Sequence, residues 1–446
     1  MVKLSTIGMS LMLALSTPAV SEIFKPKTAK LDNGMEIVLI ENHLAPVVSV
    51  ALVYKVGTAD DPVDMIGLSH FLEHLMFKGT HKVPAGAFKE KIISKGGLIN
   101  AYTTQDVTVY RCDIAVENDL GNLDMVLGIE ADRMANLIFD EKETKAEQKV
   151  VMEERRMRLD NNPLGAAYET ILRSLFKYHP YGIPTIGYPQ HIEAYTNEAA
   201  KNHYHKWYTP NNAVLIISGD VTLDKLLPIV QKHFNAIKAR PIPQRKRVKD
   251  PVDKGVTQEI RIQSPRISFV NFDWYYRAPN HNSSKNEHYY PLIVLSQILG
   301  GNANSRLYKE LVDKSGIALE ASAHYEDESI DPKHFEITAT LHPDYQPEEL
   351  KAAVEKQVKL LLDKGITKEE LKIAQRDLLA GLAFARDGNS GAINAFKRLA
   401  FGFTVAEIER YPELIRAVTV EQVNAAAKAI LGGGASVYSE VHPEKS

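Results

Sequence analysis

The chain has 446 residues and a formal net charge of -3, and 24% of its residues are charged. This length exceeds the usual size of a single core, so two or more domains are expected. The balanced charge gives no indication of a polyanionic partner, and no nucleic-acid partner is expected. Cys112 is the single cysteine, which excludes an intrachain disulfide.

The N-terminus has the pattern of a secretory signal peptide. Lys3 precedes an apolar run from Ile7 to Leu15, and small residues follow as far as Ser21. A membrane anchor is the alternative, but the run is shorter than the roughly 20 residues that span a bilayer. We therefore predict a signal peptide over residues 1–21, a periplasmic or secreted protein and no membrane span.

The next segment, GLSHFLEHLMFKGT at residues 67–80, combines an apolar helix with three polar groups. Residues four apart lie on one face of a helix, so His70 and His74 can bind one cation. Two imidazoles suit Zn2+, which keeps a position for water in catalytic sites. Glu73 can accept a proton from that water. A satisfied core histidine is the usual alternative, but burying three unpaired polar groups would cost several kcal/mol.

A third ligand is expected from the helix AEQKVVMEERR, residues 146–156. Glu147 and Glu154 are separated by two helical turns, so both can face one site, whereas Glu153 points elsewhere. We assign Glu154 as a ligand of one Zn2+ per chain and Glu147 as a catalytic carboxylate that orients a ligand or the water. The alternative is an exposed acidic helix paired with the neighbouring arginines.

The chain contains an internal repeat. YPQHIEAYTNEAAKNHY at residues 188–204 resembles YPELIRAVTVEQVNAAA at 411–427, and FDEKETKAEQKVVMEE at 139–154 resembles ITKEELKIAQRDLLAG at 366–381. Alternating strands and long amphipathic helices occur in both halves. The fold class is therefore predicted as α+β, with two homologous domains that each pack helices on a mainly antiparallel sheet.

Prolines, charges and lost hydrophobic periodicity mark a linker over residues 238–258. Its basic cluster is interpreted as a solvated linker rather than a nucleic-acid-binding arm. The linker separates a zinc-binding catalytic domain at residues 22–237 from a second domain at 259–446. In the register of the repeat Ala374 and Gly381 replace the two glutamates, and no H-x-x-E-H follows the linker, so the second domain is expected to be non-catalytic.

These segments, together with GGLINAYTTQDVTVY, HPYGIPTIGYPQHIEAYT and ILGGNANSRLYKELVDKSG, resemble the pitrilysin-type inverzincin metallopeptidases. That family includes insulin-degrading enzyme and the mitochondrial processing peptidase, and the resemblance runs through nearly all of the mature chain. It implies His70, His74 and Glu154 as zinc ligands, Glu73 as general base and Glu147 as a supporting carboxylate.

The resemblance also implies how substrate is held. A peptide would add as an extra strand to the sheet edge LINAYT, residues 98–103, through the backbone of Asn100, Ala101 and Tyr102. An ordinary inner strand is the alternative. Family members form an enclosed chamber from two related halves or subunits, which admits peptides and unfolded segments.

The chain departs from the family at two positions. Many relatives carry an arginine and, seven residues later, a tyrosine that stabilise the tetrahedral intermediate, but Val312 and Leu319 occupy these positions. Neither can donate a hydrogen bond to a developing oxyanion. We hypothesise that a related non-catalytic subunit supplies the pair in a heterodimer, with a homodimer as the alternative.

The predicted function is a zinc-dependent endopeptidase in which Glu73 activates a zinc-bound water. A dedicated processing peptidase for one precursor peptide and a non-catalytic peptidase-like scaffold subunit are the alternatives. Ligand type alone also leaves manganese or cobalt open as the metal.

Overall fold

The computed structural model describes residues 23–444 except residues 118, 252–255 and 285, so the predicted signal peptide lies outside the described residues. A six-stranded sheet with the order β1-β2-β6-β3-β5-β4 forms the first half. Its strands are β1 (Lys27–Lys30), β2 (Glu36–Glu41), β3 (Val47–Tyr54), β4 (Leu98–Thr103), β5 (Thr108–Ala115) and β6 (Ala213–Gly219). Strand β6 reads AVLIISG and is buried throughout, which explains its central place.

A five-stranded sheet with the order β7-β11-β8-β10-β9 forms the second half. Its strands are β7 (Thr257–Ser264), β8 (Asn271–Ala278), β9 (Ala318–Tyr325), β10 (Lys333–Leu341) and β11 (Ser436–Pro443). Neighbouring strands are antiparallel except for the pairs β2–β6 and β7–β11, which are parallel. The predicted fold class, two domains with mainly antiparallel sheets and packed helices, is confirmed.

The helices of the first half cover its sheet and connect its strands. They are α1 (Leu68–Leu75), α2 (Ala87–Ser94), α3 (Gly121–Asn136), α4 (Glu141–Arg155), α5 (Pro163–Leu175), α6 (Pro189–Ala194), α7 (Asn197–Trp207) and α8 (Leu223–Phe234). Those of the second half are α9 (Tyr289–Gly300), α10 (Pro347–Lys364), α11 (Lys368–Asp387), α12 (Asn389–Lys397), α13 (Val405–Glu409), α14 (Tyr411–Ala417) and α15 (Val420–Leu431). Shorter helical segments used below are η1 (Thr58–Asp60), η2 (Arg156–Asp160) and η6 (Tyr308–Lys314).

The internal repeat is visible in matching hydrogen bonds. The side chain of Gln148 on α4 donates to three carbonyls around the end of α6, and Gln375 on α11 donates to three carbonyls around the end of α14. Thr196 and Thr419 cap the helices that follow, α7 and α15. The two halves therefore repeat the same local structure as well as the same sequence pattern.

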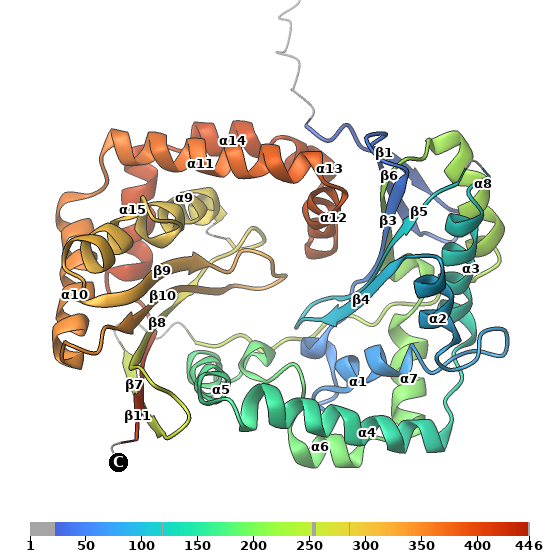
Figure 1. The fold of residues 1–446 in the computed structure, drawn as a ribbon, viewed down its shortest axis with the longest axis horizontal. Helices are drawn as coiled ribbons and strands as arrows, with labels where there is room; N and C mark the ends of the chain where they lie inside the picture. The colour runs from blue at the N-terminus through green and yellow to red at the C-terminus, as the bar shows by residue number, and fades with distance from the viewer. Residues whose placement is uncertain (1–22, 118, 252–255, 285, 445–446) are drawn as a thin grey trace, which may run out of the picture.

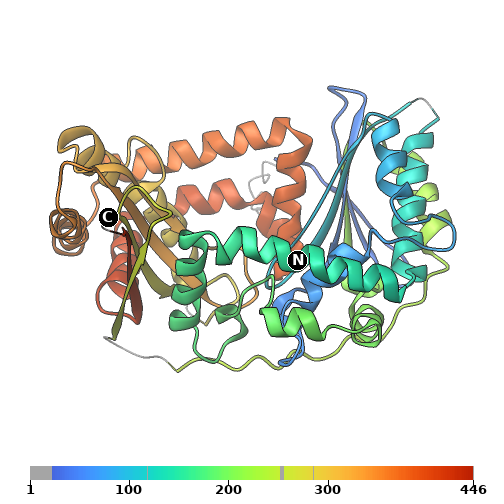
Figure 2. The same cartoon turned by 60° about the horizontal axis from the view of Figure 1, so that its bottom comes forward.

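Each half contributes one helix to the sheet of the other. Helix α12 of the second half packs on β3 and β6, and α5 of the first half packs on β7, β8 and β11. Figure 1 shows this exchange, and Figure 2 shows the segment from α4 to α5 crossing from one sheet to the other. Apolar residues of both halves, such as Val53 and Phe396, belong to one continuous core. Packing of apolar side chains thus holds the two halves together.

The linker is not simply solvated. Arg247 has a side chain only 6% exposed, and it forms ion pairs with Asp60, Asp106 and Asp331. Arg245 pairs with Asp60 as well. The interpretation of the basic cluster as solvated was therefore wrong for these arginines, because acidic groups that are remote in sequence converge on them. None of the helices within the described residues is both long and apolar enough to cross a membrane.

Candidate metal centre

Helix α1 presents its two histidines on one side while its apolar side chains enter the core. Leu68, Phe71, Leu72 and Leu75 are buried beneath it. The helix begins at Gly67, whose φ of 93° is left-handed and favours glycine.

The carboxylate of Asp61 accepts hydrogen bonds from the backbone N–H groups of Gly67 and Ser69. This acidic cap fixes the start of α1 and therefore the position of His70, which follows directly.

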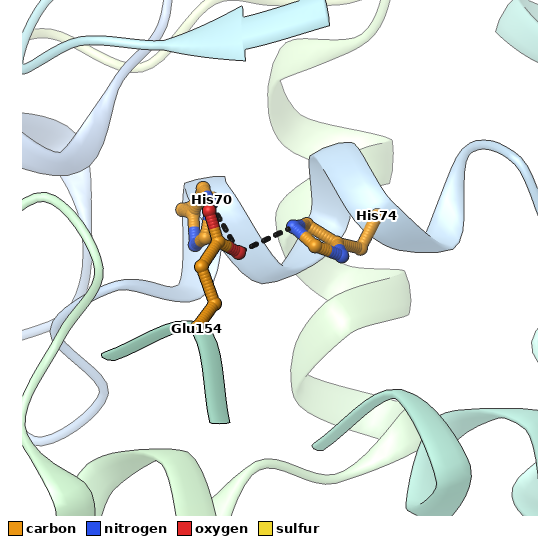
Figure 3. Close-up of side chains that lie close together, drawn as sticks. All are labelled: His70, His74 and Glu154. Atoms are coloured by element: carbon orange, nitrogen blue, oxygen red, sulfur yellow. Dashed lines mark ion pairs between the residues drawn. The ribbon is translucent and has the colours of Figure 1, made fainter. Parts of the chain in front are cut away.

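The predicted ligands come together. Oε2 of Glu154 lies 3.6 Å from Nε2 of His70 and 3.2 Å from Nε2 of His74. The three potential ligand atoms all lie within 4.8 Å of one another, and Figure 3 shows Glu154 reaching up from α4 toward the two imidazoles. Two imidazole nitrogens and one carboxylate oxygen at this spacing fit a single Zn2+ and leave a coordination position open.

Glu147 occupies the supporting position predicted for it. Its Oε1 lies 2.8 Å from Nδ1 of His74, and its Oε2 lies 2.5 Å from Nζ of Lys78. Because Nδ1 of His74 is held by a carboxylate, its Nε2 faces Glu154, which is the arrangement that orients a metal-binding imidazole. Glu153 instead pairs with Arg156 at the surface, as expected from its position on the helix.

The electrostatics of the centre follow from burial and close pairing. Burial, reinforced by His74, lowers the pKa of His70 to about 4. Burial also lowers the pKa of His74, but hydrogen bonds with Glu147 and Glu154 outweigh it and raise the pKa to about 9. The two carboxylates thus favour a protonated His74, and a cation bound at its Nε2 would displace that proton.

Glu73 lines the same cavity as the three potential ligands and faces strand β4. Its carboxylate is 7% exposed and accepts a hydrogen bond of 2.7 Å from the hydroxyl of Thr103. Burial raises the pKa of Glu73, and the Thr103 hydrogen bond opposes that shift.

One supporting contact, that of Thr103 with Glu73, was missed by sequence reasoning alone. Thr103 could not have been found, because only the tertiary structure brings β4 to α1. Arg158, four residues after Glu154, pairs with it at 2.9 Å and is one of the neighbouring arginines expected beside this acidic helix.

A cavity of about 460 Å3 opens over the centre. It is lined by His70, Glu73, His74, Ala101, Tyr102, Thr103, Gln105, Glu154, Arg158, Leu159, Tyr168, Glu169, Leu172 and residues 183–186. The cavity therefore joins the metal centre to β4 and to the middle of α5.

Strand β4 is an edge strand, not an inner one. It pairs with β5 and, among the described residues, with no other strand. Ala101 and Tyr102 line the cavity, whereas Asn100 does not belong to its lining. An edge of this kind presents free backbone groups to an extended chain.

Val312 and Leu319 lie in the second half. Val312, on η6, packs against the core, and Leu319, on β9, is 40% exposed. Within the described part of the chain, neither belongs to the lining of the cavity at the metal centre. The structure thus places no hydrogen-bond donor at either position.

Comparison with known proteins decides the family. Residues 36–188 match the family model "Insulinase (Peptidase family M16)", and residues 194–378 match "Peptidase M16 inactive domain". The zinc protease PqqE of Helicobacter pylori is 33% identical over 377 residues, covering 82% of this chain and 80% of that protein. The chain belongs to the M16 peptidase family. A zinc protease of Bacillus subtilis, YmxG, is 25% identical over 89% of this chain and 94% of that protein.

Solved structures of two bacterial proteases have the same architecture. A protease from Helicobacter pylori superposes with a TM-score of 0.87 at 27% identity, covering 94% of this chain and all of that one. The first half of the periplasmic protease PqqL from Escherichia coli gives a TM-score of 0.76 at 20% identity, covering 94% and 92% of the two chains. The second match supports the two-domain fold alone.

Proposed function

We propose that this M16 member is a zinc-dependent endopeptidase that hydrolyses peptides or unfolded polypeptide segments. The observation that carries the proposal is the convergence of His70, His74 and Glu154 beside Glu73, under a cavity bordered by an edge strand. The donor set is that of a catalytic zinc site. The similarity to proteins named zinc proteases supports the same metal.

Each residue of the centre has a defined task in this proposal. A bound Zn2+ would supply a Lewis acid for the water and for the scissile carbonyl. Glu147 orients the imidazole of His74. Glu73 takes a proton from the attacking water and delivers it to the departing amine, and Thr103 holds its carboxylate in place.

The substrate would bind as an additional strand on β4. Backbone groups of Asn100, Ala101 and Tyr102 would pair with an extended peptide, which makes binding tolerant of sequence. A folded protein cannot offer such a strand easily, so peptides and unfolded segments are the proposed substrates. We further propose that residues 22–237 form the catalytic domain, that residues 238–258 connect it to the second domain, and that the two enclose the substrate together with a partner subunit.

We also propose a heterodimer with a related, non-catalytic subunit. The supporting observation is that Val312 and Leu319 stand where many relatives of this family have an arginine and a tyrosine. The periplasmic or secreted location is supported by the signal-peptide pattern of residues 1–21, and one structural relative is titled a periplasmic protease.

Cleavage of a mixed peptide library by the purified chain without residues 1–21 tests the function, with bound zinc quantified and Glu73→Gln as control. We expect about one zinc per chain in both forms and a loss of about 10²- to 10⁴-fold in turnover in the variant. Cleavage that survives in Glu73→Gln would refute the mechanism. Cutting of a single peptide in the library would instead indicate a processing peptidase.

The missing pair can be tested in the chain itself. In a homodimer of the chain, the double variant Val312→Arg/Leu319→Tyr should increase Glu73-dependent cleavage, because each copy could then offer both donors to the centre of the other. If the unaltered chain alone already cleaves peptides as fast as the double variant, the heterodimer proposal fails.

A further inference from the structure

We propose that a buried ion cluster of Asp106, Arg247 and Asp331 positions the substrate strand β4 against the second half. The inference deepens the proposed peptidase function and rests on it. Arg247 and Asp331 are therefore positioning residues, which act on the reaction through β4 rather than by touching the substrate.

The guanidinium of Arg247 joins three separate parts of the chain. It lies 2.6 Å from Asp106, in the turn between β4 and β5, and 3.0 Å from Asp331, in the turn between β9 and β10. It also lies 3.0 Å from Asp60 on η1. The side chains of Asp60 and Asp106 are 2% exposed, so their carboxylates are shielded from water and are paired with the arginine instead.

The two turns also contact each other directly. The backbone N–H of Ile330 donates to Asp106 at 2.9 Å. Tyr181 donates its hydroxyl hydrogen to Asp106 and accepts one from the backbone N–H of Asp331. Figure 1 shows the β4–β5 and β9–β10 hairpins meeting between the two halves. The tip of one edge hairpin is therefore bonded to the tip of the other.

Asp106 of the cluster lies only three residues along the chain from Thr103, which contacts Glu73. Thr103, at the end of β4, donates to Glu73, and Asp106 follows within the same turn. Backbone bonds from Thr58 and Ala59 to the carbonyls of residues 104 and 105 tie that turn to η1. A displacement of the turn would thus move both the peptide-binding edge and the group that holds the general base.

An edge strand needs such an anchor. Strand β4 is hydrogen-bonded to β5 along one side, and its other side is the proposed site for substrate. Removing the Arg247 charge would leave carboxylates of like charge close together in a buried place, and their repulsion would loosen the turn. We therefore expect β4 to be more mobile and to bind the peptide more weakly.

A matched control is available in the same linker. Arg277 on β8 pairs with Asp250 at 3.4 Å and donates to the carbonyl of Pro251 at 2.7 Å. Arg277→Gln therefore removes a contact between the linker and the second half without removing a bond to the β4–β5 turn. A general effect of loosening the linker would appear equally in this variant.

The experiment compares Arg247→Gln, Asp331→Asn and Arg277→Gln with the unaltered chain, and each protein is loaded with zinc. For kinetics, each is combined with the same partner subunit if the unaltered chain needs one for activity. Amide hydrogen exchange of residues 98–107 is measured together with kcat, KM and zinc content. In Arg247→Gln we expect faster exchange there and a fall in kcat/KM of about ten- to hundredfold, since a small misplacement of reacting groups has that effect. Asp331→Asn should also increase the exchange rate of residues 98–107 and lower kcat/KM. Zinc content should be the same in all variants.

Unchanged exchange of residues 98–107 in Arg247→Gln would overturn the inference, and so would equal losses in Arg277→Gln. If Arg247→Gln does not fold, Asp331→Asn decides the matter, because it leaves the pairs of Arg247 with Asp60 and Asp106 in place. If the unaltered chain shows no Glu73-dependent cleavage even with its partner subunit, the proposed function fails and the catalytic part of the inference fails with it. Amide exchange of residues 98–107 does not depend on cleavage, so it still shows whether the cluster holds β4 in place.

Discussion

Replacing Glu147 by glutamine tests whether this carboxylate acts on the metal through His74. The side chain of Glu147 is 8% exposed and is bonded to Nδ1 of His74 at 2.8 Å and to Nζ of Lys78 at 2.5 Å. Glutamine has nearly the same shape and keeps a carbonyl acceptor, but it has no charge. The imidazole would remain near its place while the hydrogen bond that orients it becomes weaker.

The expected magnitude follows from the hydrogen bond that changes. A bond to a charged group contributes about 1.5–3 kcal/mol and a neutral one about 0.5–1.5 kcal/mol. The substitution should therefore cost about 1–1.5 kcal/mol, which corresponds to about tenfold weaker zinc binding. This lies at the lower end of the ten- to hundredfold loss that is typical for partners of metal-binding histidines.

Competition with a chelator of known affinity measures the zinc dissociation constant of each variant. Glu143→Gln is the matched control, because Glu143 lies one turn earlier on α4, 3.7 Å from Lys78, and its side chain is 39% exposed. We expect the control to bind zinc as the unaltered chain does. Unchanged zinc affinity in Glu147→Gln, or an equal loss in Glu143→Gln, would refute a role through His74.

Two further predictions concern stability. Arg133 is buried and pairs with Glu130 at 2.5 Å. Arg133→Met should lower the free energy of unfolding by about 3–5 kcal/mol, measured by urea denaturation, because it leaves a buried carboxylate unpaired. Glu130→Met/Arg133→Met should lower it less, and equal losses in the two variants would contradict this reasoning. Burial raises the pKa of Asp331, but hydrogen bonds with His179 and Arg247 outweigh it and lower the pKa to about 2. Its stabilisation, about 2 kcal/mol, is therefore present above the unfolded pKa near 4 and lost as the pH falls from there toward 2. Asp331→Asn should be less stable than the unaltered chain at pH 7, and the difference should shrink below pH 4; a constant difference would disprove the assignment.

The metal centre was predictable because its spacing is local. The separation of His70 from His74 and of Glu147 from Glu154 follows from the period of a helix, and that period holds wherever the helix packs. The duplication was readable for the same reason, since matching segments form matching helices and caps, as Gln148 and Gln375 show. The packing of α4 against α1, which brings Glu154 to the two histidines, and the identity of the cation lay outside this pattern.

The remaining features depended on contacts between distant segments. Whether LINAYT forms an edge strand is decided by which strands stand beside it, and its own residues do not encode that. The partners of Arg247 come from positions 141 residues before it, at Asp106, and 84 residues after it, at Asp331. A basic residue in a polar linker is solvated unless the fold brings carboxylates to it. The sequence by itself therefore determined which polar groups share one face of α1, because helical period is local, and the tertiary structure decided which side chains from α4 and β4 meet them.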